Sequence, residues 1–336
     1  MSLPSDTIWS SSIHGEHMTR LAPRLLGALA AVLALVLAGC GSGGDQQAAA
    51  PAAPGFPVTI GHAYGQTTIP DRPQRVVTVG YNDADFVLAL GVVPVGVRQS
   101  IGAFDSATRP WAQQALNGQR PEVVGSDELD IERIASLQPD VIIGLYSYMD
   151  QATYDRLSQI APTLADPVKD VAAPWQEQTR ITGRALGVPE RAEQAVADVE
   201  RRFADARTAN PQFAGKNVSV TLVAASEFYS LGRDDLRTQV FTGLGLGVPP
   251  TTETLSSELI GRLDAQGIAV VGVPPQVALG NPVFANLGAT RADRVAFLGE
   301  ESSPVAGALG FSSPLSLPYL LDQITPELAR VYATTP

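Results

Sequence analysis

Short apolar runs alternate with amphipathic segments along most of the chain after residue 56. Arg75–Val79, Val92–Val97 and Val141–Ile143 are apolar runs of strand length, and such continuous runs are typical of strands buried on both faces. Between them, Asp83–Leu90 and Asp130–Leu137 have apolar residues at helical spacing. Strands that alternate with helices predict an α/β fold with a largely parallel sheet.

The stretch from Trp175 to Asn210 has a different pattern. It is rich in Ala, Glu, Arg and Gln and is interrupted only near Gly187. From Pro189 to Asn210 the apolar residues follow a spacing of three and four: Ala192, Val196, Val199 and Phe203. This spacing predicts one long helix with a single buried stripe.

The strand and helix pattern resumes after this helix, with predicted elements at Val218–Val223, Thr238–Leu244, Ser256–Asp264 and Ile268–Val271. The two halves also share a detail. Glu132 and Glu258 each stand near the start of a predicted helix, about ten residues before a buried strand. We therefore predict two similar α/β lobes, 56–168 and 213–336, joined by a rigid helical divider at 169–212.

The N-terminal part of the chain has the pattern of a secretion signal. Arg20 and Arg24 precede an apolar run, Leu25–Ala38, which as a helix would span about 21 Å, short for a membrane span. The run ends in Leu-Ala-Gly-Cys40, which resembles a bacterial lipoprotein signal peptide. We expect residues 1–39 to be removed and Cys40 to be lipidated, with translation starting at Met18.

Residues 40–55 contain almost no large apolar side chains beyond Cys40 and predict a flexible tether. Acyl chains on Cys40 would hold the folded part at a membrane. We therefore expect the protein on the extracytoplasmic face of the cell membrane.

Composition narrows the function classes. The chain has 336 residues and a formal net charge of −11, which disfavours nucleic acid as a partner. Histidine occurs only at positions 14, 17 and 62, and Cys40 is the single cysteine. The sequence therefore excludes disulfides within the chain and His/Cys metal clusters.

Four motifs carry a family resemblance: Gln74–Gly80, Leu90–Val97, Ile131–Ile142 and Phe311–Pro318. Together they resemble the helical-backbone class of ABC-transporter substrate-binding proteins, whose members serve importers of iron-siderophores, haem and cobalamin. The last stretch is most similar to the actinobacterial iron-siderophore branch. The resemblance implies a ligand cleft between the lobes, and one glutamate on each lobe, here Glu132 and Glu258, that docks on the importer.

The resemblance also implies the ligand, a ferric siderophore delivered to an ABC-transporter permease by a monomeric protein that is not an enzyme. A siderophore already surrounds its iron with oxygen donors, so the protein needs aromatic faces and arginines, and no resident metal or cofactor. In α/β folds the residues that bind ligands lie on the loops that follow the strands. The candidate ligand-binding residues are Tyr81, Arg98, Trp111, Tyr146, Tyr148, Phe228, Tyr229 and Arg237.

Other functions remain as alternatives. Haem would need an axial ligand, for which Tyr81, Tyr146 or Tyr229 is available, and cobalamin belongs to the same fold. A Ser-His-Asp enzyme would depend on His62, and the chain has no G-x-S-x-G motif. A pair of catalytic carboxylates is not excluded by the sequence.

Overall fold

The structure is a computed structural model that describes residues 53–99, 108–169, 171–224, 227–300 and 302–333. The predicted signal peptide, the start at Met18, the lipidation site Cys40 and nearly all of the tether lie outside these residues. Within the described ranges, no helix combines the length and apolar character needed to cross a membrane.

The first sheet has five parallel strands in the order β5-β4-β3-β6-β7. They are β3 (Val76–Thr78), β4 (Gly96–Val97), β5 (Glu122–Val123), β6 (Val141–Ile143) and β7 (Thr163–Leu164). The central strands β3 and β6 are buried at every residue, which explains why their sequences are apolar except for Thr78. A separate antiparallel hairpin, β1 (Val58–His62) and β2 (Gly65–Ile69), packs on the core of this lobe.

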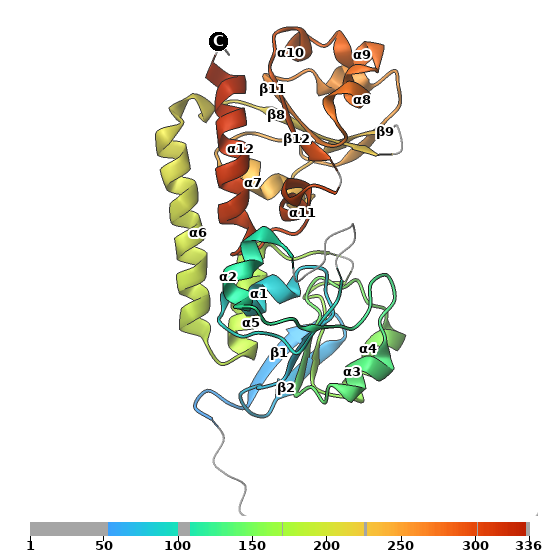
Figure 1. The fold of residues 1–336 in the computed structure, drawn as a ribbon, viewed down its shortest axis with the longest axis vertical. Helices are drawn as coiled ribbons and strands as arrows, with labels where there is room; N and C mark the ends of the chain where they lie inside the picture. The colour runs from blue at the N-terminus through green and yellow to red at the C-terminus, as the bar shows by residue number, and fades with distance from the viewer. Residues whose placement is uncertain (1–52, 100–107, 170, 225–226, 301, 334–336) are drawn as a thin grey trace, which may run out of the picture. The chain divides into compact units, whose positions relative to one another are not determined.

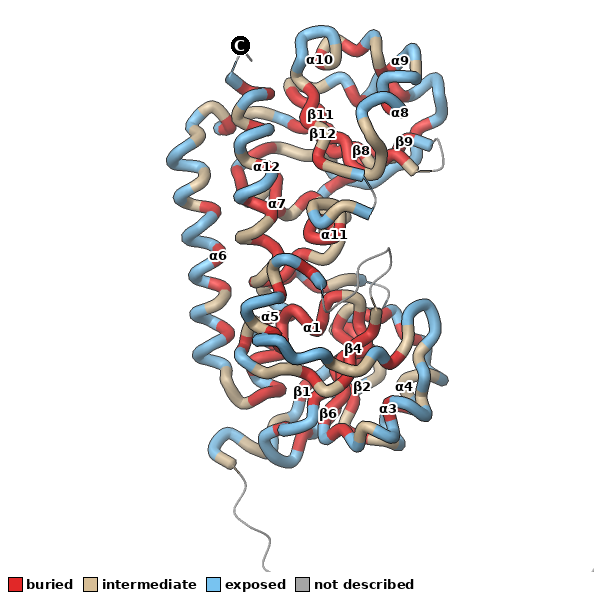
Figure 2. The backbone as a smooth tube through the Cα atoms, viewed as in Figure 1, coloured by how far each residue is buried: buried red, intermediate tan, exposed pale blue. Residues whose placement is uncertain are grey.

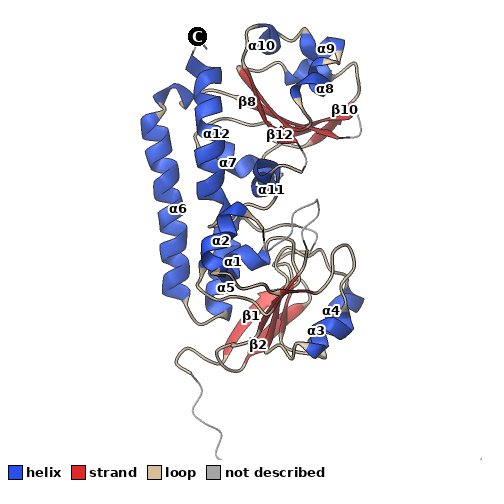
Figure 3. Ribbon diagram, viewed as in Figure 1, coloured by secondary structure: helices blue, strands red, loops and turns tan. Residues whose placement is uncertain are grey.

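The second sheet is mixed, in the order β10-β9-β8-β11-β12. Its strands are drawn in red next to helices α8, α9 and α10 in Figure 3. Strands β8 (Val218–Ala224), β11 (Gly267–Gly272) and β12 (Val295–Glu300) are parallel. Strands β9 (Glu227–Leu231) and β10 (Glu253–Leu255) extend the sheet in antiparallel fashion. The prediction of two α/β lobes is confirmed; the sheet of the first lobe is parallel, whereas that of the second is mixed.

Helices cover the sheets and connect their strands (Figure 1). The α-helices are α1 (Asp83–Ala89), α2 (Gln113–Leu116), α3 (Ile131–Ser136), α4 (Gln151–Ser158), α5 (Trp175–Ala185), α6 (Pro189–Ala209), α7 (Gln239–Gly243), α8 (Pro275–Leu279), α9 (Pro282–Ala285), α10 (Gly288–Arg291), α11 (Pro304–Gly310) and α12 (Ser316–Ala333). The 3-10 helices are η1 (Pro110–Ala112), η2 (Pro211–Phe213), η3 (Leu236–Thr238) and η4 (Ile260–Leu263).

Helix α6 is the predicted divider, and it joins the hydrophobic cores of both lobes. Its buried residues are the predicted stripe, visible as spaced buried turns in Figure 2. Ala192 belongs to the core beneath β3 and β6, whereas Val196, Val199 and Phe203 belong to the core around β8 and α12. One continuous helix therefore contributes to two cores.

Two predicted elements are shorter than expected. The run Val92–Val97 forms strand β4 only at Gly96 and Val97. Val95 still donates its N–H to the Val76 carbonyl oxygen, whereas Pro94 has no backbone N–H to donate. The predicted helix Ser256–Asp264 is a turn followed by η4. Gly261 lies within it and disfavours an α-helix, and the carboxylate of Asp264 accepts the Gly288 and Ala289 N–H groups at the start of α10.

Candidate ligand-binding cleft

A cavity of about 690 Å³ lies where the strands of both sheets end. Tyr81 follows β3, and Tyr146 and Tyr148 follow β6. On the other side the wall includes Leu222–Ala224 at the end of β8 and Val271–Gly272 at the end of β11. The carboxyl ends of parallel strands are the usual ligand sites of such sheets, and the volume is in the range of small-molecule pockets.

Aromatic rings form one wall of the cavity. The Tyr81 and Tyr146 rings meet edge to face with centroids 5.8 Å apart, and Tyr146 and Tyr148 do so at 5.2 Å. Phe311, at the end of α11, lies 6.2 Å from Tyr81 and 6.4 Å from Tyr146. The cluster combines loops of the first lobe with a residue from the second. Tyr148 leaves 47% of its surface exposed, so its ring is available to a ligand.

A buried carboxylate, Asp166, holds in place the loop that carries Tyr146 and Tyr148. Asp166 accepts the backbone N–H groups of Ser147 and Tyr148 and the Ser147 hydroxyl. Tyr148 has a φ of 51°, an unusual conformation for a residue with a bulky side chain. Burial raises the pKa of Asp166, while its hydrogen bond with Ser147 lowers it. These bonds offset the cost of the strained conformation and present the Tyr148 ring to the cavity.

Burial also raises the pKa of Tyr146, and its hydrogen bond with Tyr148 acts in the same direction. Burial likewise raises the pKa of Tyr148. The rings therefore present neutral phenols at physiological pH.

Arg98 lies beneath this wall, with its guanidinium carbon 4.2 Å from the centre of the Tyr81 ring. The side chain is 6% exposed. Its N–H groups donate to the carbonyl oxygens of Ser126 and Asp127 and to the Tyr81 hydroxyl, at 2.6, 2.9 and 3.2 Å. Arg98 thus supports the aromatic wall from behind and is not part of the cavity lining.

The charged part of the wall is Asp234, Asp235 and Arg237. Arg237 donates two hydrogen bonds to the Asp235 carboxylate, from Nε at 2.8 Å and from Nη2 at 2.6 Å. Burial acts to lower the pKa of Arg237, but its bonds to Asp235 outweigh this effect and the pKa is raised. Across the described residues, no three His, Cys, Asp or Glu side chains gather as a metal site.

A family model described as "Periplasmic binding protein" matches residues 76–301. The chain belongs to the periplasmic binding protein family. The match spans both sheets and the divider helix α6, so the predicted family and architecture are confirmed together.

Similar family members include proteins of known structure. A periplasmic solute binding protein of Mycobacterium smegmatis is 36% identical over 82% of this chain and 98% of its own, with a TM-score of 0.73. Streptococcus pneumoniae PiaA in complex with ferrichrome is 25% identical over 83% of this chain and 100% of its own, with a TM-score of 0.72. The Bacillus subtilis protein "Probable siderophore-binding lipoprotein YfiY" is 29% identical over 50% of each chain. The chain thus spans about half the length of the first curated relatives that it matches.

The structure brings together four of the sequence-predicted ligand-binding residues: Tyr81, Tyr146, Tyr148 and Arg237 all line the cavity. Phe311 joins them, although sequence reasoning gave it no role. The sequence feature that could have indicated Phe311 is the Phe-Ser-Ser-Pro motif that it begins. Its place at the cleft depends on where α11 ends.

Phe228 and Tyr229 lie on β9 and not on a loop after β8. Successive strand residues point to opposite faces of a sheet. Phe228 is 4% exposed and packs against Phe284, with centroids 5.5 Å apart. The half-buried Tyr229 donates its hydroxyl to Glu227 at 2.6 Å. The structure therefore places both outside the cavity lining.

Trp111 belongs to a polar junction between the lobes, also outside the cavity lining. Its indole N–H donates to Asp85 at 2.7 Å, and its ring packs on Tyr319 of α12. The same carboxylate receives Arg109 at 3.0 Å and the hydroxyl of Ser313 at 3.2 Å. Asp85 thus ties α1 of the first lobe to the segment before α12 of the second.

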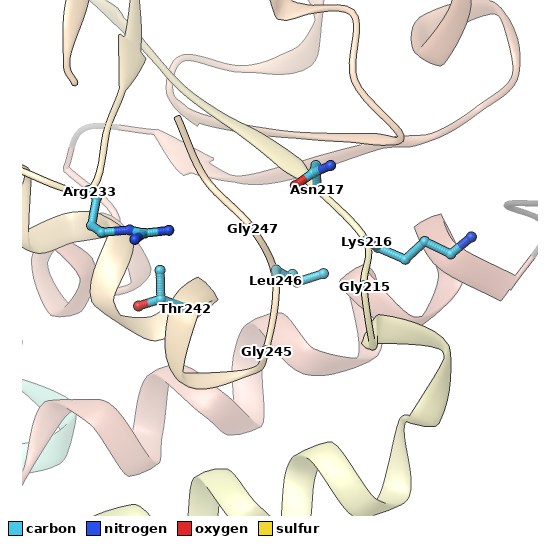
Figure 4. A pocket seen from close by; sticks show the side chains of 8 residues that line it. All are labelled: Gly215, Lys216, Asn217, Arg233, Thr242, Gly245, Leu246 and Gly247. Atoms are coloured by element: carbon cyan, nitrogen blue, oxygen red, sulfur yellow. The ribbon is translucent and has the colours of Figure 1, made fainter. Parts of the chain in front are cut away.

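A second hollow, of about 430 Å³, lies in the second lobe between the loop before β8 and the end of α7 (Figure 4). Arg233 follows β9 and lines this hollow, beside Thr242. Arg233 is close to Arg237 in sequence but lines this hollow and not the ligand-binding cleft.

Glu132 and Glu258 are exposed, one on each lobe. Glu132 lies in the first turn of α3, where Asp130 caps the helix by accepting the Arg133 N–H at 2.9 Å. Glu258 lies in the turn before η4. Each glutamate has an Arg–Glu ion pair close by in sequence, Arg133–Glu122 and Arg262–Glu253.

Proposed function

We propose that this chain captures a ferric siderophore in the cleft between its lobes and delivers it to an ABC importer. The observation that carries the proposal is the aromatic wall of the 690 Å³ cavity, formed by Tyr81, Tyr146, Tyr148 and Phe311. The names of the relatives support it, since YfiY is called siderophore-binding and PiaA was solved with ferrichrome.

The chemistry of the wall suits this class of ligand. A siderophore occupies the coordination sites of its ferric ion with its own oxygens, so the binding protein needs shape and flat apolar contacts. Aromatic rings provide large contact areas, and their hydroxyls add hydrogen bonds at the edge. The cavity accordingly needs no metal ligands of its own.

Haem and cobalamin are the alternatives within the same fold. Haem iron bound by tyrosine requires a phenolate. Because burial raises the pKa of both Tyr146 and Tyr148, neither phenol is poised to lose its proton. This observation favours a ligand that arrives with its iron already coordinated.

Glu132 and Glu258 are the proposed docking groups for the importer's permease. Both are exposed and one lies on each lobe, so a permease with two basic sites could bind both lobes at once. The protein would then act as a monomer on its permease.

Cys40 is the proposed lipidation site, which would hold the chain at the extracytoplasmic face of the membrane through the tether 40–55. We expect Cys40→Ala to move the protein from the membrane fraction into the soluble fraction, measured by fractionation and immunoblotting. A variant that stays in the membrane fraction after processing would contradict the anchor.

The proposed function is tested by titrating the full-length chain in mild detergent with ferric siderophores, haem and cobalamin. Tryptophan and tyrosine fluorescence is the readout. We expect saturable quenching by a ferric siderophore, with weaker binding of its iron-free form. Binding of haem alone, marked by a strong Soret band, or of cobalamin alone, would overturn the siderophore assignment.

A further inference from the structure

The charged side chains that line the cleft bear on which ferric complexes it can bind. Among the described residues that line the cavity, Arg237 is the single cation, and Asp234 and Asp235 are the anions. The Asp235 carboxylate takes both the Nε and the Nη2 donors of Arg237. The positive charge at the wall is therefore already neutralised by the protein.

Arg98, the other cation close to the aromatic wall, does not change this balance. It is 6% exposed, and its donors are directed to carbonyl oxygens and to the Tyr81 hydroxyl. An anionic ligand would have to break these bonds to reach it, and a buried donor that loses its partner is costly.

The sequence of the undescribed internal positions adds no positive charge either. Positions 100–107, 170, 225–226 and 301 contain no lysine, arginine or histidine, and they include Asp105, Asp170 and Glu301. These positions therefore add no lysine, arginine or histidine to the charged side chains of the described wall.

Resting on the proposed function, we propose that this cleft selects ferric complexes without net negative charge, neutral or cationic ones of the hydroxamate class. Three monoanionic hydroxamates around Fe³⁺ leave a neutral complex, whereas three dianionic catecholates leave a triply negative one. An anion that leaves water for a partly enclosed cavity needs a compensating charge. A neutral complex needs only the aromatic wall, and a cationic one gains from Asp234 and from the ring faces.

The test compares four probes on the full-length chain by fluorescence quenching: ferrioxamine B, which is cationic, ferrichrome, which is neutral, and the anionic complexes ferric enterobactin and ferric citrate. We expect at least one of the first two to bind about tenfold or more tighter than both anions, the smallest effect of one missing charge-assisted contact. Tighter binding of either anionic complex would overturn the charge selection and leave the proposed function standing. If no ferric complex binds, the proposed function fails and the selection fails with it.

The variant Asp235→Asn examines the cause of the selection. Asparagine keeps the oxygen that accepts the Arg237 backbone N–H but removes the charge that neutralises the guanidinium. We expect affinity for ferric enterobactin to rise several-fold and affinity for ferrioxamine B to fall. The control Asp198→Asn makes the same change in net charge at an exposed ion pair on α6, and it should leave the ratio of affinities unchanged. An equal ratio in Asp235→Asn and the control would show that this ion pair does not set the selection. If Asp235→Asn fails to fold, the order of the four probes on the unmodified chain decides the proposal.

Discussion

Replacing Asp85 by asparagine should strongly destabilise the fold, because this carboxylate is the centre of the junction between the lobes. It is 1% exposed, and its ion-pair partner Arg109 is 2% exposed. One oxygen receives Arg109, and the other receives the Trp111 indole and the Ser313 hydroxyl. Asparagine has one acceptor and one donor at these positions, so at least one buried N–H or O–H would face another donor.

The expected magnitude follows from the burial of the pair. Removing one partner of a buried ion pair typically costs about 3–5 kcal/mol, because the remaining charge stays in a medium of low dielectric constant. With a urea slope of about 3 kcal/mol per M, the unfolding midpoint should fall by about 1–2 M. Neutralising an exposed pair should cost less than about 1 kcal/mol.

Urea denaturation followed by far-ultraviolet circular dichroism measures this difference. The control is Glu193→Gln, which removes the same charge from an exposed ion pair with Arg180, in which the glutamate side chain is 61% exposed. If Asp85→Asn unfolds at the same urea concentration as Glu193→Gln, the junction contributes nothing beyond a surface pair. The assignment of Asp85 as the structural link between the lobes would then be refuted.

Three further predictions concern docking, packing and pH. The double variant Glu132→Arg with Glu258→Arg should abolish import of labelled ferric siderophore and leave its dissociation constant unchanged; normal import would exclude this docking pair. Phe203→Ala should destabilise the fold by about 3–5 kcal/mol in thermal or urea unfolding, since Phe203 is 5% exposed in the second-lobe core, and a loss below 1 kcal/mol would contradict its role there. Burial, and after it the nearby charge of Asp166, raises the pKa of Asp83 well above its ordinary 3.8. The contribution of Asp83 to folding stability is therefore fully present below pH 3.8 and is lost as the pH rises through the folded-state pKa. Asp83→Asn should therefore flatten this fall in stability with rising pH, measured by urea midpoints across a pH series, and an unchanged slope would show that Asp83 titrates normally.

The sequence predicted the elements whose pattern is set by burial alone. Strands β3 and β6 are apolar except for Thr78 and are buried at every residue, and the stripe of α6 repeats at helical spacing, so the hydrophobic pattern was sufficient for both. Strand β9 was missed because its sequence, Glu-Phe-Tyr-Ser-Leu, begins only two residues after β8. It was therefore interpreted as a loop that carries aromatic residues. That single error moved Phe228 and Tyr229 into the predicted pocket.

The remaining differences in the site come from contacts between residues far apart in the chain. Arg98 has the position expected of a ligand-binding arginine, directly after β4. Its availability depends on carbonyl oxygens almost thirty residues away, which no local pattern reveals. The indole N–H of Trp111 is likewise bound by the distant Asp85 carboxylate. Phe311 reaches the cleft only through the packing of α11.

The same contacts connect the architecture of the lobes to the proposed charge selection. Helix α6 is part of both cores, and the buried Asp85 carboxylate binds Ser313 across the junction, so a large change in the angle between the lobes would break buried contacts. A cleft with limited closure cannot gather new charges around its ligand after binding. Its selectivity must then reside in the wall that is already present, where aromatic rings meet an arginine paired with its own aspartate. Such a wall stabilises a ferric complex that brings no negative charge, and offers little to one that does.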